Sequence, residues 1–347
     1  MKTKEQLAER EELAKQSELT LTEFCNEHPA YSIDADQPEY RGGTNLITFG
    51  HRRTEEGQQQ PIVFKYFIRT YRFSQEYFCL HHFADTGHVP KILAAVPDRL
   101  IVMTRYPASG IEAEQLNLVE RKAVSSEMGK AVADWVRWPL PNAENWPTPQ
   151  TEFEQLQWRT DMGEIIGHVL SLCRQIQAVV PSYQTPFYSE ALALTEQHVD
   201  FIDQQPRVLF HEDFANLSVH QGHFLGFYDL EMVRIGTEAM QLGCALELVN
   251  PQWIDSEWLV WADFIQAFQE TTRRTLDEAD FLAILAMNHF YYHIRLCRWG
   301  KWNGNPAEIE NMNFATSNAA SYLTNIKRTC FSLREWVDLY KWFPSLR

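Results

Sequence analysis

The residues best suited to chemistry follow two short apolar runs in the second half of the chain. The first run leads to His211 and Asp213, and Asn216 lies three positions later. The second run ends at Asp229, and Glu231 lies two positions later. Carboxylate and amide oxygens are ligands that Mg²⁺ accepts, and phosphoryl transfer requires metal ligands and a carboxylate that orients the attacking hydroxyl. The two runs carry candidates for both tasks, although each residue taken alone could be structural.

Three further candidates lie nearer the N-terminus. Gly42-Gly43-Thr44-Asn45 is a turn-forming segment before an apolar run, and glycine lets a backbone approach phosphates closely. Lys65 stands in the middle of the apolar run Ile62–Phe67, where a lysine otherwise serves mainly to protect a sheet edge. Glu76 lies near the start of a predicted helix, where the alternative is an ordinary exposed glutamate.

In this order, the residues resemble the aminoglycoside phosphotransferase and choline kinase family of small-molecule kinases. The resemblance extends from Tyr40 to Asn250 and is most specific in the segment that contains the two apolar runs. It implies that Asp213 accepts or orients the proton of an acceptor hydroxyl. It also implies that Asn216 and Asp229 bind Mg²⁺, and that Glu231 lies behind these ligands or reaches a second ion.

The same resemblance assigns the N-terminal candidates to ATP. The glycine-rich turn would lie over the phosphates, and Lys65 would contact the α- and β-phosphates. Glu76 would pair with Lys65, although the sequence does not separate it from its neighbour Gln75 in this role. Thr104 and Tyr106 lie in a segment that resembles the linker between the lobes, whose backbone groups would bind adenine.

One departure from the family pattern concerns the loop after Asp213. The family places four residues between the catalytic aspartate and the asparagine, whereas only two separate Asp213 from Asn216. An ungapped alignment would put Ser218 at the metal position but would shorten the following hairpin by two residues, so Asn216 is favoured. The short loop keeps open a second hypothesis, a catalytically impaired pseudokinase that binds nucleotide as a regulatory module. A helical scaffold with fortuitous motifs ranks third.

The elements that must position these residues follow from the apolar periodicity and the turn signals. Helices are predicted at 4–28 (one or two, peripheral), 73–84, 112–136 and 160–204, and β-hairpins at 46–67, 92–104 and 217–229. The last hairpin turns at Gln221-Gly222, and the chain after Glu231 is predicted to be helical. Thr275 and Glu278 have the spacing of a capping box for one of these helices.

These elements and the family resemblance predict an α+β, two-lobed, protein-kinase-like fold. A chain of 347 residues is long enough for two lobes. Residues 1–107 would form a small β-rich lobe with N-terminal helices that binds ATP. Residues 108–347 would form a larger helical lobe that carries Asp213 and binds the acceptor.

The composition narrows the class of partner. Lys and Arg number 31 against 46 Asp and Glu, so the net charge is −15 and its field repels nucleic acids. The N-terminus has no signal-like apolar region, and no stretch reaches the roughly 18 consecutive apolar residues of a membrane span. We therefore expect a cytoplasmic protein with no nucleic-acid or membrane partner. The six cysteines have no CxxC pairing, which predicts reduced packing residues.

The expected acceptor is a small polyhydroxylated or amine-bearing molecule with a free hydroxyl. The acidic balance favours a cation weakly, and the chain lacks the Ala-Pro-Glu signature of kinases that act on proteins. Aromatic residues of the second lobe could hold a cation or could be core: Trp253, Trp258, Trp261, Tyr291, Tyr292, Trp299 and Trp302. The sequence does not distinguish among acceptors and does not give the oligomeric state.

Overall fold

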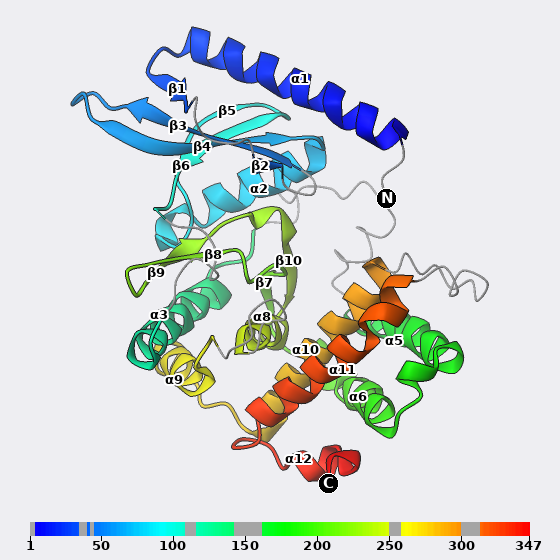
Figure 1. The fold of residues 1–347 in the computed structure, drawn as a ribbon. Coiled ribbons are helices and arrows are strands. Elements are labelled where there is room, and N and C mark those ends of the chain that lie inside the picture. The colour runs from blue at the N-terminus through cyan, green and yellow to red at the C-terminus, as the bar shows by residue number, and fades with distance from the viewer. Residues whose placement is uncertain are drawn as a thin grey trace. The chain divides into compact units, whose positions relative to one another are not determined.

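The computed structural model describes residues 4–34, 40–41, 45–107, 116–141, 162–249, 258–299 and 313–347 (Figure 1). These residues form two compact units. The first contains the described residues up to 107 together with Pro141 and Leu225–Met232, and the second contains the others. A division of the chain at residue 107 stays a prediction, to which the structure adds that the segment carrying Asp229 belongs with the first unit.

The first unit is built on an antiparallel sheet. Its strands are β1 (Tyr31–Ile33), β2 (Tyr40–Arg41), β3 (Asn45–Arg53), β4 (Gln59–Phe67), β5 (Ile92–Val96) and β6 (Leu100–Thr104). The order is β1-β3-β4-β6-β5, and β2 pairs with β3. Both predicted hairpins of this region are present, and β3 and β4 are longer than expected because their polar ends also pair, up to Arg53 with Gln59.

Two helices accompany this sheet, α1 (Lys4–Glu27) and α2 (Thr70–His82). The expectation that the N-terminal segment is peripheral was wrong for its second half, because Leu21 and Phe24 are buried in the core of the sheet. They share that core with Leu46, Ile62, Phe64, Tyr66, Leu100 and Val102. The turn of α1 that carries Phe24 therefore gains stability from burial of apolar surface, at about 25 cal/mol for each Å².

The second unit is mainly helical. Its helices are α3 (Leu118–Arg137), α5 (Met162–Val179), α6 (Pro186–Gln197), α7 (Val199–Asp203), α8 (Glu238–Leu246), α9 (Trp261–Thr272), α10 (Glu278–Trp299), α11 (Asn313–Ser332) and α12 (Leu339–Trp342). The predicted capping box of α10 was wrong. Asp277 caps this helix: its carboxylate accepts from the Asp280 amide at 3.0 Å, and the Asp280 carboxylate accepts from the Asp277 amide at 3.1 Å. A carboxylate one residue before the helix is better placed for this role than Thr275.

Four strands frame the residues of interest in the second half of the chain. They are β7 (Arg207–His211), β8 (Leu217–His220), β9 (His223–Phe227) and β10 (Val233–Thr237). The β8–β9 hairpin turns where it was predicted, with Gln221 and Gly222 both at positive φ. The prediction that only helices follow Glu231 was wrong, because β10 pairs antiparallel with β7, from Val233 opposite His211 to Thr237 opposite Arg207. Its strand pattern is short and interrupted by Arg234 and Gly236, so periodicity alone does not reveal it.

The cysteines and the long helices agree with the expected core. Cys79, Cys173, Cys244 and Cys330 are buried free thiols, and Cys25 is half-buried. On α10, the buried side chains include Leu282, Leu285, His289 and Tyr292, so these residues face the interior. Among the described helices, none combines the length and apolarity needed to span a membrane.

Candidate active site

Lys65 lies in the interior of the sheet. It is on β4, which pairs with β3 on one side and β6 on the other, so that Lys65 stands between Ile47 and Ile101. Only 4% of its surface is exposed. This position excludes protection of a sheet edge as its role. A buried ammonium group is costly unless carboxylates compensate its charge.

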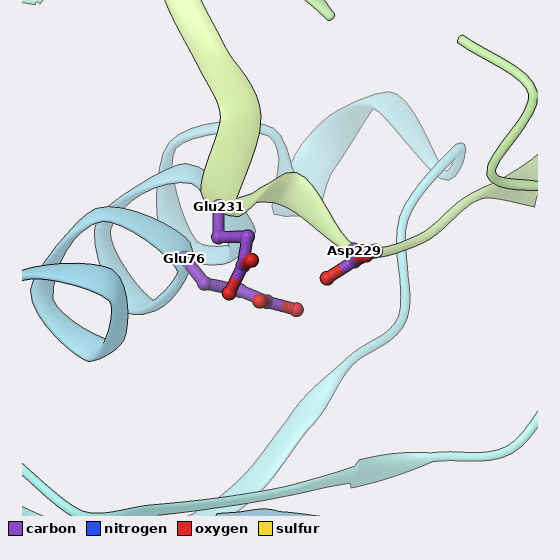
Figure 2. Close-up of side chains that lie close together, drawn as sticks. All are labelled: Glu76, Asp229 and Glu231. Carbon is purple, nitrogen blue, oxygen red and sulfur yellow. The ribbon is translucent and has the colours of Figure 1, made fainter. Parts of the chain in front are cut away.

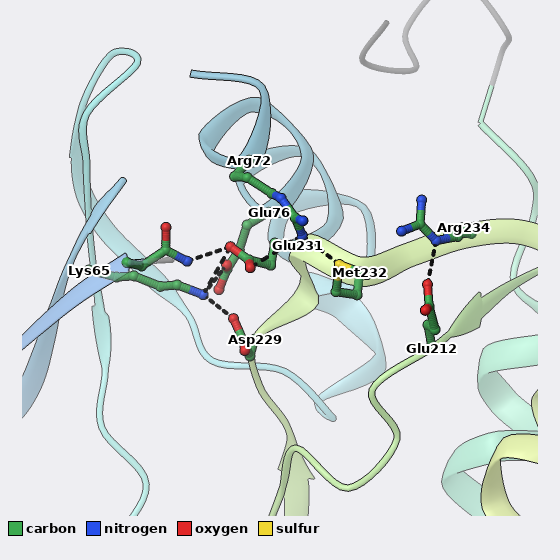
Figure 3. A network of polar contacts seen from close by, with 9 residues as sticks. Lys65, Arg72, Glu76, Glu212, Asp229, Glu231, Met232 and Arg234 are labelled. Carbon is green, nitrogen blue, oxygen red and sulfur yellow. Dashed lines mark hydrogen bonds and ion pairs between the residues drawn. The ribbon is translucent and has the colours of Figure 1, made fainter. Parts of the chain in front are cut away.

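The compensating carboxylates come from two other segments (Figure 3). The Lys65 ammonium donates to the Glu76 carboxylate on α2 and to the Asp229 carboxylate, and it lies 4.0 Å from the Glu231 carboxylate. The ion pair with Glu76 resolves the choice that the sequence left open between Glu76 and Gln75. All four residues belong to the first unit.

The charges of this group shift its protonation equilibria. Burial raises the pKa of Glu76 to about 8, because the cost of burying a charge outweighs the attraction of Lys65, and Asp229 and Glu231 add repulsion. Burial alone would lower the pKa of Lys65, but the charges of Asp229, Glu76 and Glu231 overcome it and raise that pKa. Lys65 therefore stays charged over the whole physiological pH range.

The three carboxylates form a donor set suited to a hard cation. One oxygen each from Glu76, Asp229 and Glu231 lies within 4.8 Å of the others (Figure 2). Mg²⁺ prefers such oxygen donors. The Asp229 side chain is 33% exposed, against 1% for Glu76 and 5% for Glu231, so Asp229 is the carboxylate of the three that a solvated ion can reach.

The backbone that delivers Asp229 is tightly held. Asp229 has a left-handed conformation, with φ of 60°, which costs energy in a residue other than glycine. Three residues earlier, Gly226 has φ of 149°, and a Cβ placed there would lie 2.2 Å from the Tyr106 hydroxyl. The amide of Phe227 donates to the His88 carbonyl at 2.8 Å. The sequence did not indicate His88, which fixes this segment through a backbone contact.

The remaining N-terminal candidates are placed as follows. Asn45 opens β3 and is buried, and its side-chain amide donates to the Glu231 carboxylate. The Thr104 amide donates to the Lys91 carbonyl at 2.9 Å, and adenine binding by backbone groups of this segment stays a prediction. The Tyr106 hydroxyl lies against Gly226, and burial raises its pKa. Gly42, Gly43 and Thr44 lie outside the described residues.

Asp213 and Asn216 lie in the second unit, in the connection between β7 and β8. The connection is a tight turn in which the Asn216 amide donates to the Asp213 carbonyl at 2.9 Å. Both residues are partly exposed, whereas Ser218 on β8 is fully buried. The Asn216 side chain is thus the more accessible of the two, and the choice of Asn216 over Ser218 as metal ligand stays a prediction.

The residues that hold this connection were not apparent from the sequence. Glu212 is paired with Arg234 on β10 at 2.6 Å, and both side chains are buried. The His211 amide donates to the Gln241 side chain at 2.8 Å. The ring of Trp135 stacks on His211 with 6.2 Å between centroids and an interplanar angle of 16°. Arg234 lies on β10 and Gln241 on the helix that follows it, and the apolar pattern of the sequence does not reveal that strand.

A comparison with protein families covers both the carboxylates around Lys65 and the connection between β7 and β8. Residues 52–282 match the model of the phosphotransferase enzyme family. The chain belongs to this family. The match covers β4, α2 and the segment from β7 to β10, so it includes every candidate residue described above except the glycine-rich turn and Asn45.

Solved structures of phosphotransferases share the fold of this family member. Macrolide 2'-phosphotransferase MphH from Brachybacterium faecium is 16% identical, with a TM-score of 0.57, and the alignment covers 86% of this chain and 97% of that one. The streptomycin–ATP ternary complex of APH(2")-IIa is 11% identical, with a TM-score of 0.55, and the alignment covers 88% of this chain and 95% of that one. Amicoumacin kinase hAmiN, in complex with AMP-PNP, Ca²⁺ and Ami, is 15% identical, with a TM-score of 0.52, and the alignment covers 88% of this chain and 93% of that one. A comparison with curated proteins gave no significant match.

The fold of the phosphotransferase is therefore the α+β, protein-kinase-like fold that the sequence predicted. The sequence left open whether the aromatic residues of the second lobe contact the acceptor or belong to the core. Trp258, Trp261, Tyr291 and Tyr292 are all at most 5% exposed, which makes them core residues. Trp253, Trp302 and the side chain of Trp299 lie outside the described part of the chain.

Proposed function

We propose that this chain transfers the γ-phosphate of ATP to a hydroxyl group of a small molecule, with Mg²⁺ as the metal. The observation that carries the proposal is the placement of Lys65 in a central strand, between Glu76 on α2 and Asp229. A purely structural lysine would not need a third carboxylate nearby. Phosphoryl transfer does need a cation held in a fixed direction, beside a carboxylate that binds metal.

The residues of the first unit would bind the nucleotide. Lys65 would donate to the α- and β-phosphates, and Glu76 would keep its ammonium group in that direction. The glycine-rich turn and Asn45 would lie at the phosphates, and Thr104 and Tyr106 would lie near adenine. The assignment of these residues to the nucleotide is supported by the pairing of β3 with β4 and by the contact of Lys65 with Glu76 on α2.

Asn216 and Asp229 would hold Mg²⁺, which when bound neutralises charge that develops on the transferred phosphoryl group. Asp213 would accept the hydrogen bond of the acceptor hydroxyl, orient its oxygen and take its proton as the new P–O bond forms. Its partial exposure suits that task, because the carboxylate must be reachable by the acceptor.

The proposed acceptor is a small polyhydroxylated or amine-bearing molecule. Support comes from structural relatives described as a macrolide phosphotransferase and as a complex with streptomycin. The net charge of −15 agrees with an amine-bearing acceptor. A cytoplasmic location is the setting in which ATP and Mg²⁺ would both be supplied.

A pseudokinase is the second candidate, favoured by one observation. Two residues instead of four separate Asp213 from Asn216, and the tight turn between them fixes their backbones close together. A pseudokinase would bind nucleotide without releasing ADP in response to an acceptor.

The test is calorimetry with Mg·ATP followed by a coupled ADP-release assay. The acceptor panel contains aminoglycosides, macrolides, choline, ethanolamine, homoserine, sugars and nucleosides. We expect ATP binding and acceptor-dependent ADP release with at least one amine-bearing or polyhydroxylated compound. No binding at millimolar Mg·ATP would contradict the kinase proposal, and binding without turnover across the panel would favour the pseudokinase. Turnover with a peptide alone would refute the acceptor class.

A further inference from the structure

Arg72 occupies the same face of α2 as Glu76. The two residues are four positions apart, and residues at that spacing are neighbours on a helix surface. Arg72 is 7% exposed, and its guanidinium donates to the Glu231 carboxylate at 3.3 Å and contacts the Met232 sulfur (Figure 3). One face of α2 thus holds Lys65 through Glu76 and holds the segment after Asp229 through Arg72.

Both carboxylate oxygens of Glu231 are engaged by protein donors. Oε1 accepts from Arg72 on α2, and Oε2 accepts from Asn45 at the start of β3. Lys65 lies 4.0 Å from Oε2. With 5% of its side chain exposed, Glu231 is turned towards the protein. These contacts are those of an internal anchor that ties together β3, α2 and the segment that carries Asp229.

Asp229 needs such an anchor. Its left-handed backbone is unfavourable for an aspartate and persists only where the surroundings impose it. Glu231 lies two residues after Asp229, in the short 3₁₀ turn Leu230–Met232, so a fixed Glu231 restrains the backbone that directly follows Asp229. Residues that hold metal ligands in place in this way typically change metal affinity or activity 10- to 100-fold when they are removed.

We infer that Arg72 is a positioning residue, which together with Asn45 clamps Glu231 and thereby orients Asp229 towards the metal of the phosphotransferase site. The inference rests on the proposed function for the metal. It assigns Glu231 to the anchor and not to the metal ligands. The clamp itself is a property of the protein without nucleotide, and this allows two separate tests.

The first test is hydrogen–deuterium exchange on the protein without nucleotide. Arg72→Met is expected to increase exchange in peptides that cover Leu225–Met232, because loss of the clamp lets this segment open more often. Arg72→Lys, which keeps the charge, should give a smaller increase. Arg274→Met is the matched control, since it removes an arginine that bridges Glu238 and Asp280 in the second unit, and it should leave these peptides unchanged. Equal exchange in Arg72→Met and the unsubstituted protein would overturn the inference.

The second test is calorimetry with ADP, in Mg²⁺ and in EDTA. Arg72→Met should reduce the gain in ADP affinity that Mg²⁺ provides by about 10- to 100-fold, while the affinity in EDTA changes by no more than about twofold. Glu231→Gln should give a similar loss, and the double variant should lose about as much as either single one, because both act through one contact. A loss in Glu231→Gln with none in Arg72→Met would show that Glu231 is a metal ligand and overturn the inference. If the unsubstituted protein binds no ADP, the proposed function fails, and the exchange experiment alone decides the clamp.

Discussion

Two groups of buried charges, one in each unit of the chain, balance their charges differently (Figure 3). In the first unit, Lys65 and Arg72 face three carboxylates, Glu76, Asp229 and Glu231. In the second unit, Glu212 faces Arg234 in a pair that is 8% and 5% exposed. The first group has one more carboxylate than it has cations, and burial raises the pKa of Glu76 to about 8, whereas the second pairs one carboxylate with one cation.

Under the proposed function, this difference distinguishes a group that binds a ligand from a structural ion pair. Buried ions are costly, and a paired arginine and glutamate compensate each other without need of a ligand. A group with an excess carboxylate gains free energy when another cation enters, and Asp229 is the member exposed to solvent. We therefore expect substitutions in the first group to change nucleotide and metal binding, and those in the second to change stability and turnover.

The largest expected effect concerns turnover. Asp213→Asn should lower kcat about 10²- to 10⁴-fold, the usual contribution of a general base, because the amide cannot take the proton of the acceptor. The affinity for Mg·ATP should change by no more than about twofold, since the proposed role of this carboxylate is on the acceptor and not on the nucleotide. The ADP-release assay and calorimetry measure the two quantities.

The matched variant is Asp229→Asn in the first group. It should reduce the Mg²⁺-dependent gain in nucleotide affinity, most visibly when the metal is limiting. Equal losses of binding and turnover in Asp213→Asn would show that the base is misassigned, and unchanged binding in Asp229→Asn would remove that residue from the metal site.

The next effect concerns the stability that the neutral pair provides. Arg234→Met should lower the free energy of unfolding by about 3–5 kcal/mol, because it leaves the Glu212 carboxylate buried without its partner. The double variant Glu212→Leu/Arg234→Met should recover most of that loss, since no buried charge remains. Urea unfolding followed by circular dichroism measures both.

Arg174→Met is the control for this cycle. It breaks an ion pair with Glu196 whose side chains are 52% and 58% exposed, so its cost should stay within about 1 kcal/mol. A double variant as unstable as Arg234→Met would mean that Arg234 acts through contacts other than Glu212, and the contrast between the two groups would then fail.

The sequence identified Lys65 and Asp229 as candidate site residues but not the arginines that contact the neighbouring carboxylates. Lys65 and Asp229 stand out because charged residues inside or directly after apolar runs are unusual, and the Lys65–Glu76 ion pair expected from them is present. Arg72 and Arg234 do not stand out, because an arginine in a polar helix or in a short interrupted strand has an ordinary local pattern. Their partners are distant in sequence: Arg72 and Glu231 are separated by 159 positions. Only the tertiary fold brings such residues together, whereas local patterns fix strands, turns and helices.

The core also shows why the expected acceptor aromatics could not be assigned from sequence. Trp258 and Tyr292 are buried core residues, yet large aromatic side chains at these positions could equally have lined an acceptor site. Periodicity reports burial and not its purpose. The acceptor pocket depends on which side chains remain exposed after folding, and no local rule predicts that.

The smallest expected effect concerns buried histidines, which lack the compensation that Lys65 receives. Burial lowers the pKa of His293 to about 3 and lowers that of His289 well below its usual value, so both are neutral in the folded protein. Since the folded pKa lies below the unfolded value, their contribution to stability is complete above about pH 6.5 and is lost progressively as the pH falls below it.

His293→Gln, which keeps an acceptor for the Tyr188 hydroxyl, should reduce the loss of unfolding free energy between pH 7.5 and 5.5 by about 1 kcal/mol. His168→Gln, at an exposed position on α5, should leave the pH dependence unchanged. Urea unfolding across this pH range distinguishes the two variants. If His293→Gln retains the full acid sensitivity of the unsubstituted protein, then His293 is charged or solvated in the folded state. The need for a carboxylate partner would then hold for the buried Lys65 and the buried arginines but not for buried histidines.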